Sequence, residues 1–204
     1  MNDDKLSAED LTALVRRVFE PREEDGALAI IVDLPDDEVP DNGQWHVRRA
    51  MATGWYDELA GAKDDHGLDI SLLFYRNVHS NNADLPPNAW RWSGGEPPTH
   101  CNEMVGRLEE PMEGLLRQHD LVIAPTQFST TAPLKMMAPR LGFRAATMPG
   151  FSPEMVPALR LDYTEVNRRV WLLKDLLDSA VGADFHFVVD GETEYDLHLD
   201  LRHR

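Results

Sequence analysis

The chain has 204 residues, which is enough for one domain with its own hydrophobic core and excludes a small disulfide-stapled scaffold. Its 20 Lys and Arg against 36 Asp and Glu give a formal net charge of −16, which argues against nucleic acid as a partner. No apolar run approaches the roughly 20 residues that a membrane-spanning helix needs. The acidic N-terminus lacks the pattern of a secretory signal, and the lone Cys101 allows no internal disulfide, so we expect a cytoplasmic protein.

Short β-rich runs alternate with longer helical patterns, which predicts an α/β fold. Ser7 is the expected cap of a first helix that stops before Pro21. The apolar stripe of this helix is Leu11, Leu14, Val15, Val18 and Phe19. The next run, residues 27–32, is almost entirely apolar, which favours a parallel strand buried on both faces.

A second helix is predicted to start near Asn42. Its apolar positions are Val47, Met51, Trp55 and Leu59, and its polar face carries Arg48, Arg49 and Asp57. Further strands are predicted at residues 69–75, 121–124 and 143–148.

Residues 77–100 are rich in Asn, Pro, Gly and Ser, which is typical of a long surface loop. Trp90 and Trp92 within it are interpreted as apolar anchors in preference to a surface that stacks on a ligand.

The C-terminal part changes character. Asp162 and Glu165 have the spacing of a capping box before a helix whose stripe is Val166, Val170, Leu173 and Leu177. Alternating residues on both sides of Asp190-Gly191 then predict a hairpin with a three-residue loop. One face of the hairpin would carry Phe185, Phe187, Val189, Thr193, Tyr195 and Leu197, and the other His186, Val188, Glu194, Asp196 and His198.

The residues Ser129, Thr130 and Thr131 follow a predicted parallel strand and open a helix. In open α/β sheets, ligands bind beyond the carboxyl ends of the strands, where helix N-termini attract anions. These hydroxyls are therefore a candidate site for a carboxylate or phosphate. The alternative is structural: Thr131 caps the helix, and the other hydroxyls bind loop backbone.

The turn Met148-Pro149-Gly150 lies at the end of another strand and is a candidate for the same cleft. Its alternative role is a tight turn that needs Gly150 for backbone geometry, with Met148 in the core.

Two other groups are weaker candidates. His186, Asp196 and His198 carry the residue types of a divalent metal site, although alternation on an exposed sheet face produces the same pattern. Cys101 follows His100, but neighbours in sequence do not make a nucleophile and base, and a buried unreactive thiol is favoured.

A family resemblance rests on three segments, which are Arg144–Phe151, Asp162–Val166 and the hairpin with Gly191–Thr193 and Leu197–Arg202. In this order they resemble the N-terminal half of leucyl-aminopeptidase-like metallopeptidases of the aminopeptidase T type. The resemblance implies an α/β domain followed by a catalytic domain whose Glu, His, Tyr and Asp side chains hold a pair of divalent metal ions. None of those ligand positions maps onto this chain, so the resemblance implies no catalytic residue, metal ligand or cofactor here.

We therefore expect an open, mostly parallel sheet with flanking helices, of Rossmann or flavodoxin-like layering, that ends in an antiparallel hairpin. Residues 1–182 would form the α/β domain, and residues 183–204 the hairpin leading toward a missing catalytic domain. The expected function is a non-catalytic structural or substrate-shaping domain, inactive alone; the alternative is a module that binds a small anionic ligand. The expected partner is a second copy or a separate catalytic domain, with no nucleic acid and no membrane.

Overall fold

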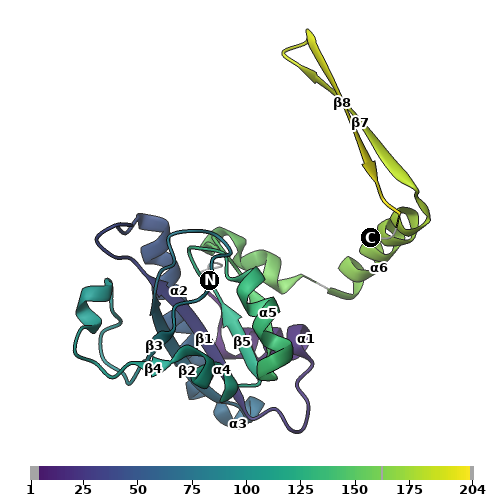
Figure 1. The fold of residues 1–204 in the computed structure, drawn as a ribbon. Coiled ribbons are helices and arrows are strands. Elements are labelled where there is room, and N and C mark those ends of the chain that lie inside the picture. The colour runs from purple at the N-terminus through teal and green to yellow at the C-terminus, as the bar shows by residue number, and fades with distance from the viewer. Residues whose placement is uncertain (1–4, 162, 203–204) are drawn as a thin grey trace. The chain divides into compact units, whose positions relative to one another are not determined.

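The computed structural model describes residues 5–161 and 163–202 of the chain. The chain forms two compact units, residues 1–160 and 161–204, and each is described by itself (Figure 1). No helix within the described residues is long and apolar enough to span a membrane.

The first unit is an α/β domain. Its helices are α1 (Ala8–Phe19), α2 (Gly43–Gly61), α3 (Lys63–His66), η1 (Cys101–Met104), α4 (Met112–Arg117), α5 (Thr131–Leu141) and η2 (Pro153–Arg160). Its strands are β1 (Ala27–Leu34), β2 (Asp69–Arg76), β3 (Asn88–Arg91), β4 (Glu110–Pro111), β5 (Leu121–Ala124) and β6 (Arg144–Thr147).

The six strands form one sheet in the order β4-β3-β2-β1-β5-β6. Strands β2, β1, β5 and β6 are parallel, and β3 and β4 add an antiparallel edge. The predicted α/β class and mostly parallel sheet are confirmed.

Helices cover both faces of this sheet. On one face, Leu28 and Ile30 of β1 share a buried cluster with residues of α1 and α2. On the other face, Ala29 and Ile31 share a second buried cluster with residues of α4 and α5. Both faces of β1 are thus covered, as its nearly continuous apolar sequence predicts.

Helix α1 forms where its cap predicts. The Ser7 hydroxyl accepts a hydrogen bond of 3.2 Å from the Asp10 backbone N–H, and the Asp10 carboxylate accepts one of 3.2 Å from the Ser7 N–H. The helix ends at Glu20, whose left-handed φ of 45° closes it just before Pro21.

Helix α2 is confirmed, and Trp55 and Leu59 of its predicted apolar stripe are buried, but the prediction was wrong for Val47 and for the two arginines. Arg48 and Arg49 are only 1% and 3% exposed, whereas Val47 is 42% exposed. The helix buries both arginines because loops at the end of the sheet supply polar partners for them, and periodicity alone does not show such partners.

Residues 77–100 are not entirely a surface loop. Strand β3 lies within this range and pairs with β2, with Trp90 opposite Phe74. Trp90 and Trp92 are both buried, and the ring of Trp92 meets Phe74 edge to face at 5.7 Å between centroids. The interpretation of the two tryptophans as anchors is confirmed.

The second unit contains α6 (Tyr163–Ser179), β7 (Gly182–Val189) and β8 (Thr193–Asp200). The predicted capping residue Asp162 lies outside the described residues. Strands β7 and β8 pair antiparallel from Val189 opposite Thr193 outward, which confirms the three-residue loop and the predicted two faces. The sequence-based boundary between residues 182 and 183 falls within β7, whereas the compact unit begins at Leu161.

The apolar residues of this second unit are exposed. On α6, Val166, Val170 and Leu173 are 37%, 55% and 55% exposed, although their spacing is that of a stripe that packs against a core. The apolar face of the hairpin is similarly open, with Phe185 and Tyr195 43% and 58% exposed.

Candidate functional site

The candidate site lies where β1 and β5 are neighbours in the sheet. The chain leaves β1 toward β2 on one side and later returns to β5 on the other, so the loops after these two strands diverge. Such a switch point is where open α/β sheets bind ligands, beyond the carboxyl ends of the strands. The loop after β5 contains Ser129, Thr130 and Thr131, as predicted.

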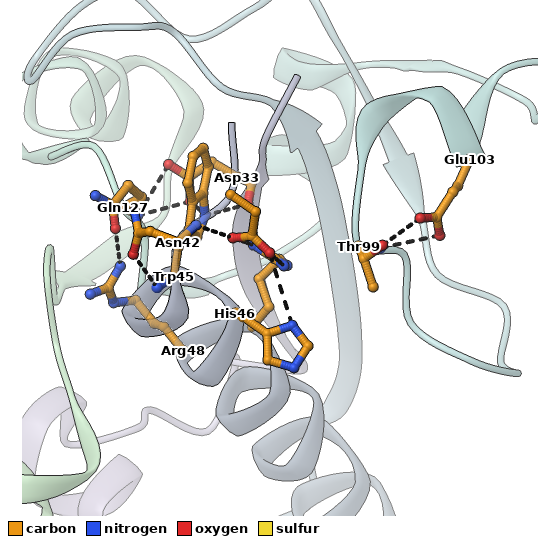
Figure 2. Close-up of polar contacts among 10 residues, drawn as sticks. Asp33, Asn42, Trp45, His46, Arg48, Thr99, Glu103 and Gln127 are labelled. Atoms are coloured by element: carbon orange, nitrogen blue, oxygen red, sulfur yellow. Dashed lines mark hydrogen bonds and ion pairs between the residues drawn. The ribbon is translucent and has the colours of Figure 1, made fainter. Parts of the chain in front are cut away.

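Asp33 organises this end of the sheet. Its side chain is fully buried near the end of β1. The carboxylate accepts hydrogen bonds of 2.8 Å from the backbone N–H of Gln127 and 3.1 Å from the Trp45 indole (Figure 2). It also accepts one of 3.0 Å from the Phe128 N–H. One carboxylate therefore joins the end of β1, helix α2 and the loop after β5.

The surroundings of Asp33 shift two pKa values. Burial raises the pKa of Asp33, against the lowering effect of its hydrogen bonds from Gln127 and Phe128. Burial, followed by the nearby Asp33 carboxylate, raises the pKa of Tyr75 well above its usual value. Both groups favour their neutral forms, as expected of a dry polar cluster.

Arg48 of α2 is a second buried charge beside this cluster. Its Nη1 donates a hydrogen bond of 2.6 Å to the Gln127 side-chain oxygen (Figure 2). Its Nε donates one of 2.7 Å to the Phe151 carbonyl. Burial lowers the pKa of Arg48, and the nearby Asp33 charge acts in the opposite direction. Arg48 thus holds together the loops that follow β5 and β6.

The neighbouring Arg49 has a conventional partner. Its guanidinium donates to both carboxylate oxygens of Asp41, at 2.9 and 2.5 Å. Burial acts to raise the pKa of Asp41, but the hydrogen bond and charge of Arg49 outweigh it and lower this pKa. Asn42, next to Asp41, caps α2: its side-chain oxygen accepts a hydrogen bond of 2.9 Å from the Trp45 N–H. The ion pair of Arg49 with Asp41 therefore helps to fix the start of the helix.

The structure brings together two of the three predicted hydroxyl residues and adds a third hydroxyl. Ser129 Oγ lies 3.2 Å from Thr131 Oγ1, which lies 2.8 Å from Thr147 Oγ1 at the end of β6. Thr130 differs: it is fully buried, and its hydroxyl has no hydrogen-bond partner within the described residues. The exposed part of the candidate site is therefore Ser129, Thr131 and Thr147.

The start of α5 is capped from another loop. Thr131 is the first residue of the helix and Thr130 precedes it, so the expected role of Thr131 as the cap was wrong. The Asn82 side-chain oxygen instead accepts a hydrogen bond of 3.1 Å from the Ala132 N–H and one of 3.0 Å from the Ser129 hydroxyl. An amide oxygen thus occupies the place where an anion would bind a helix N-terminus.

The predicted turn at Met148 and Gly150 lies against the same loop. The Met148 N–H donates to the Ala124 carbonyl at 2.9 Å, and the Gly150 N–H donates to the Thr126 carbonyl at 3.0 Å. Met148 also packs against the core, and Gly150 has a φ of 66°. These contacts are those of the tight turn that was the alternative interpretation.

The hairpin histidines form pairs with single acids. His186 Nδ1 lies 2.8 Å from Asp196, and His198 Nδ1 lies 2.6 Å from Asp184. Within residues 5–161 and 163–202, no three His, Cys, Asp or Glu side chains form a group that could hold a metal ion.

Cys101 is a structural thiol. It is fully buried, its Sγ donates to the Leu34 carbonyl at 3.6 Å, and burial raises its pKa to about 11. His100 turns away to accept a hydrogen bond of 3.1 Å from the Asn102 N–H. The pair is not arranged as nucleophile and base.

Comparisons of the chain with protein-family models, with curated proteins and with solved structures find no match. The family resemblance therefore remains a prediction that rests on its motifs. Sequence reasoning identified the loop of Ser129 and Thr131 but missed Asp33, Arg48 and Asn82. The available signal was Asp33 itself, a single acid near the end of an otherwise apolar strand.

Proposed function

We propose that the chain is the non-catalytic α/β part of a metallopeptidase of the aminopeptidase T type, with a structural or substrate-shaping role. The support is the order of elements from β5 onward, which matches the order expected from the resemblance. That order is a strand, a hydroxyl-bearing loop, a helix, a strand with a Met-Pro-Gly turn, a helix and a hairpin. With this function we propose a cytoplasmic location.

The observation that carries the proposal is the exposed apolar surface of the second unit. A single helix of this length and a two-stranded hairpin are marginally stable unless another surface covers their apolar faces. Leu172 and Leu176 of α6 are 64% and 65% exposed, and Leu197 and Leu199 of β8 are 46% and 42% exposed. We propose that these faces meet a separate catalytic domain or a second copy of the chain.

Light scattering over a wide concentration range tests the association. We expect a mass above that of the monomer, and a decrease toward the monomer mass when Phe187→Ser and Leu197→Ser are combined on the apolar face. His186→Ser on the opposite face of the hairpin is the matched control and should leave the mass unchanged. A wild-type chain that stays monomeric at every concentration would contradict self-association.

A peptidase assay tests the non-catalytic role. The purified chain is incubated with Zn²⁺, Mn²⁺ or Co²⁺ and then assayed with aminoacyl-anilide substrates, beside a known metallo-aminopeptidase as a positive control. We expect no turnover by this chain. Turnover together with stoichiometric bound metal would overturn the proposal.

A second candidate function is the binding of a small anionic ligand, and the cluster of Ser129, Thr131 and Thr147 favours it. The Thr131 hydroxyl lies 3.2 Å from that of Ser129 and 2.8 Å from that of Thr147, beyond the carboxyl ends of neighbouring parallel strands. Hydroxyls can donate hydrogen bonds to a carboxylate or phosphate, and this edge of the sheet is the usual ligand edge of such folds.

Thermal denaturation in the presence of small carboxylates and inorganic phosphate tests this second function. A ligand that binds only the folded state raises the melting temperature once its free concentration exceeds its dissociation constant, and the rise continues with the logarithm of that concentration. Ser129→Ala and Thr131→Ala should abolish the rise, whereas Thr193→Ala on the hairpin should retain it. No rise with the wild-type chain, or a rise that both site variants retain, would rule out the hydroxyl cluster.

A further inference from the structure

The segment Asn77–Asn82, called the strap here, follows β2 and is attached at both ends. At its near end, the Asn77 side chain donates a hydrogen bond of 2.9 Å to the carbonyl of Leu34, the last residue of β1. At its far end, Asn81 and Asn82 bind the loop that opens α5. The strap therefore crosses from the end of β1 to the start of α5, over the switch point of the sheet.

His79 fixes the near half of the strap between two carboxylates. Its Nε2 lies 2.7 Å from Asp36 Oδ2, and its Nδ1 lies 3.3 Å from Glu38 Oε2. A neutral imidazole carries one N–H, whereas the imidazolium carries two. The contact with Asp36 is a hydrogen bond, and the contact with Glu38 is an ion pair that requires the charged ring. The imidazolium therefore interacts favourably with both acids, whereas a neutral ring that keeps its proton on Nε2 retains only the hydrogen bond to Asp36.

The backbone of the strap also depends on its contacts. His79 and Asn82 have φ values of 59° and 62°, a left-handed conformation that is uncommon for residues other than glycine. The His79 N–H donates to the Asn77 side-chain oxygen at 3.0 Å, which supports the first of these positions. Because these two backbone conformations are unfavourable, the strap keeps them only while its side-chain contacts hold it in place.

Three charged groups bear on His79. Asp36 and Glu38 lie on the turn after β1, and Arg76 ends β2. The hydrogen bond with Asp36 and the charges of both acids raise the pKa of His79, while Arg76 and desolvation act in the opposite direction. The effect of the two acids is the larger one, so the pKa of His79 lies above its usual value of 6.5.

The far half of the strap occupies hydrogen-bonding groups of the α5 loop. Asn81 Oδ1 accepts from the Ser129 N–H at 2.8 Å, and Asn82 Oδ1 accepts from the Ala132 N–H at 3.1 Å. The Asn82 N–H in turn donates to the Ser129 carbonyl at 2.7 Å. While these bonds persist, neither N–H is open to solvent or to another acceptor.

We propose that the strap is a pH-sensitive cover over the start of α5, closed while His79 carries both ring protons and opened as it loses one. Loss of one proton leaves a ring nitrogen lone pair facing a carboxylate, which weakens the attachment of the near half. Opening frees the Ser129 and Ala132 N–H groups. The inference rests on the contacts of the strap and not on the proposed function.

Amide hydrogen exchange of the full chain, followed by NMR at several pH values, tests this cover. The result is expressed as a protection factor, which is the intrinsic exchange rate divided by the observed rate, so the pH dependence of the intrinsic rate cancels. We expect those of Ser129 and Ala132 to fall about two- to fivefold as pH rises through the His79 pKa, the range that an exposed ion pair supports. Leu134, whose N–H is bound by the Thr130 carbonyl and not by the strap, should remain unchanged.

Three variants separate the role of His79 from general effects of pH. His79→Gln should remove the pH dependence at Ser129 and Ala132, and Glu38→Gln should move its midpoint to lower pH. His46→Gln, which changes another histidine near a carboxylate, should retain the wild-type behaviour. Constant protection in the wild-type chain, or the same fall in His79→Gln, would overturn the proposal.

Discussion

Arg48 and Gln127 lie 79 residues apart in the chain, yet the Arg48 guanidinium donates a hydrogen bond of 2.6 Å to the Gln127 side-chain oxygen. The main chain of Gln127 is held at the same time by Asp33, whose carboxylate accepts from its N–H. One residue of the loop after β5 is thus fixed by two buried polar side chains from different elements. The geometry of the switch point depends on both.

Replacement of Arg48 by Met should destabilise the first unit. Met keeps the apolar part of the side chain but donates no hydrogen bond. The Phe151 carbonyl and the Gln127 side-chain oxygen then lose their donor in the protein interior. We expect the free energy of unfolding, measured with urea, to fall by about 2 to 4 kcal/mol. Arg140→Met removes an exposed ion pair with Glu113 and should change the free energy of unfolding much less. Equal costs for the two variants would contradict the role of Arg48.

The contribution of Asp33 to the free energy of unfolding should decrease as pH rises. Because burial raises its pKa, the folded chain retains this proton where the unfolded chain, with a value near 3.8, has lost it. The contribution of Asp33 is therefore most favourable below the unfolded value and is lost as pH rises through the folded value.

Asp33→Asn isolates this effect. The stability of the wild-type chain relative to the variant, measured by urea unfolding, should decrease as pH rises above the unfolded-state pKa of 3.8. Asp37→Asn, at an exposed acid on the loop after β1, controls for the loss of one negative charge. A wild-type advantage that grows with pH would show that the sign is wrong.

Trp92 should be an anchor of the first unit. Its ring is 6% exposed and packs on Phe74 of β2, so Trp92→Ala opens a large cavity. We expect a loss of about 3 to 5 kcal/mol in the free energy of unfolding. Trp171→Ala, at a position on α6 that is 57% exposed, is the matched control and should leave the unfolding of the first unit unchanged.

Cys101 should react with a thiol reagent only after unfolding. A rise in pKa from 9.0 to about 11 reduces the thiolate present at neutral pH by about 100-fold, and burial blocks access to what remains. Absorbance assays with a disulfide reagent should detect no rapid reaction in buffer and one thiol per chain in urea. Rapid labelling of the native chain would show that Cys101 is accessible.

The elements that the sequence predicts well are those with local signals. The capping box of Ser7 and Asp10 marks the start of α1 because both partners lie within one turn. The hairpin register follows from alternation on both sides of Asp190, since a shift by one residue would mix acids into the apolar face. Strand β1 is recognisable because nearly every residue is apolar.

The features that the sequence does not reveal depend on partners far along the chain. Arg48 looks like a polar-face residue until Phe151 and Gln127 supply its acceptors, 103 and 79 residues away. The cap of α5 comes from Asn82, which is 50 residues from Ala132. Local pattern reasoning assigned the cap to Thr131 because it considers only neighbouring residues.

The two sheets differ in how they end. One edge strand of the large sheet, β4, contains only Glu110 and Pro111, and proline has no N–H to offer a further strand. The other edge strand, β6, is only four residues long. The hairpin instead has strands of eight residues each, and their outer edges carry the backbone groups that β-strand addition uses. Fibril growth at high concentration or during refolding should therefore begin at residues 182–200, and a single proline in β7 or β8 should delay it.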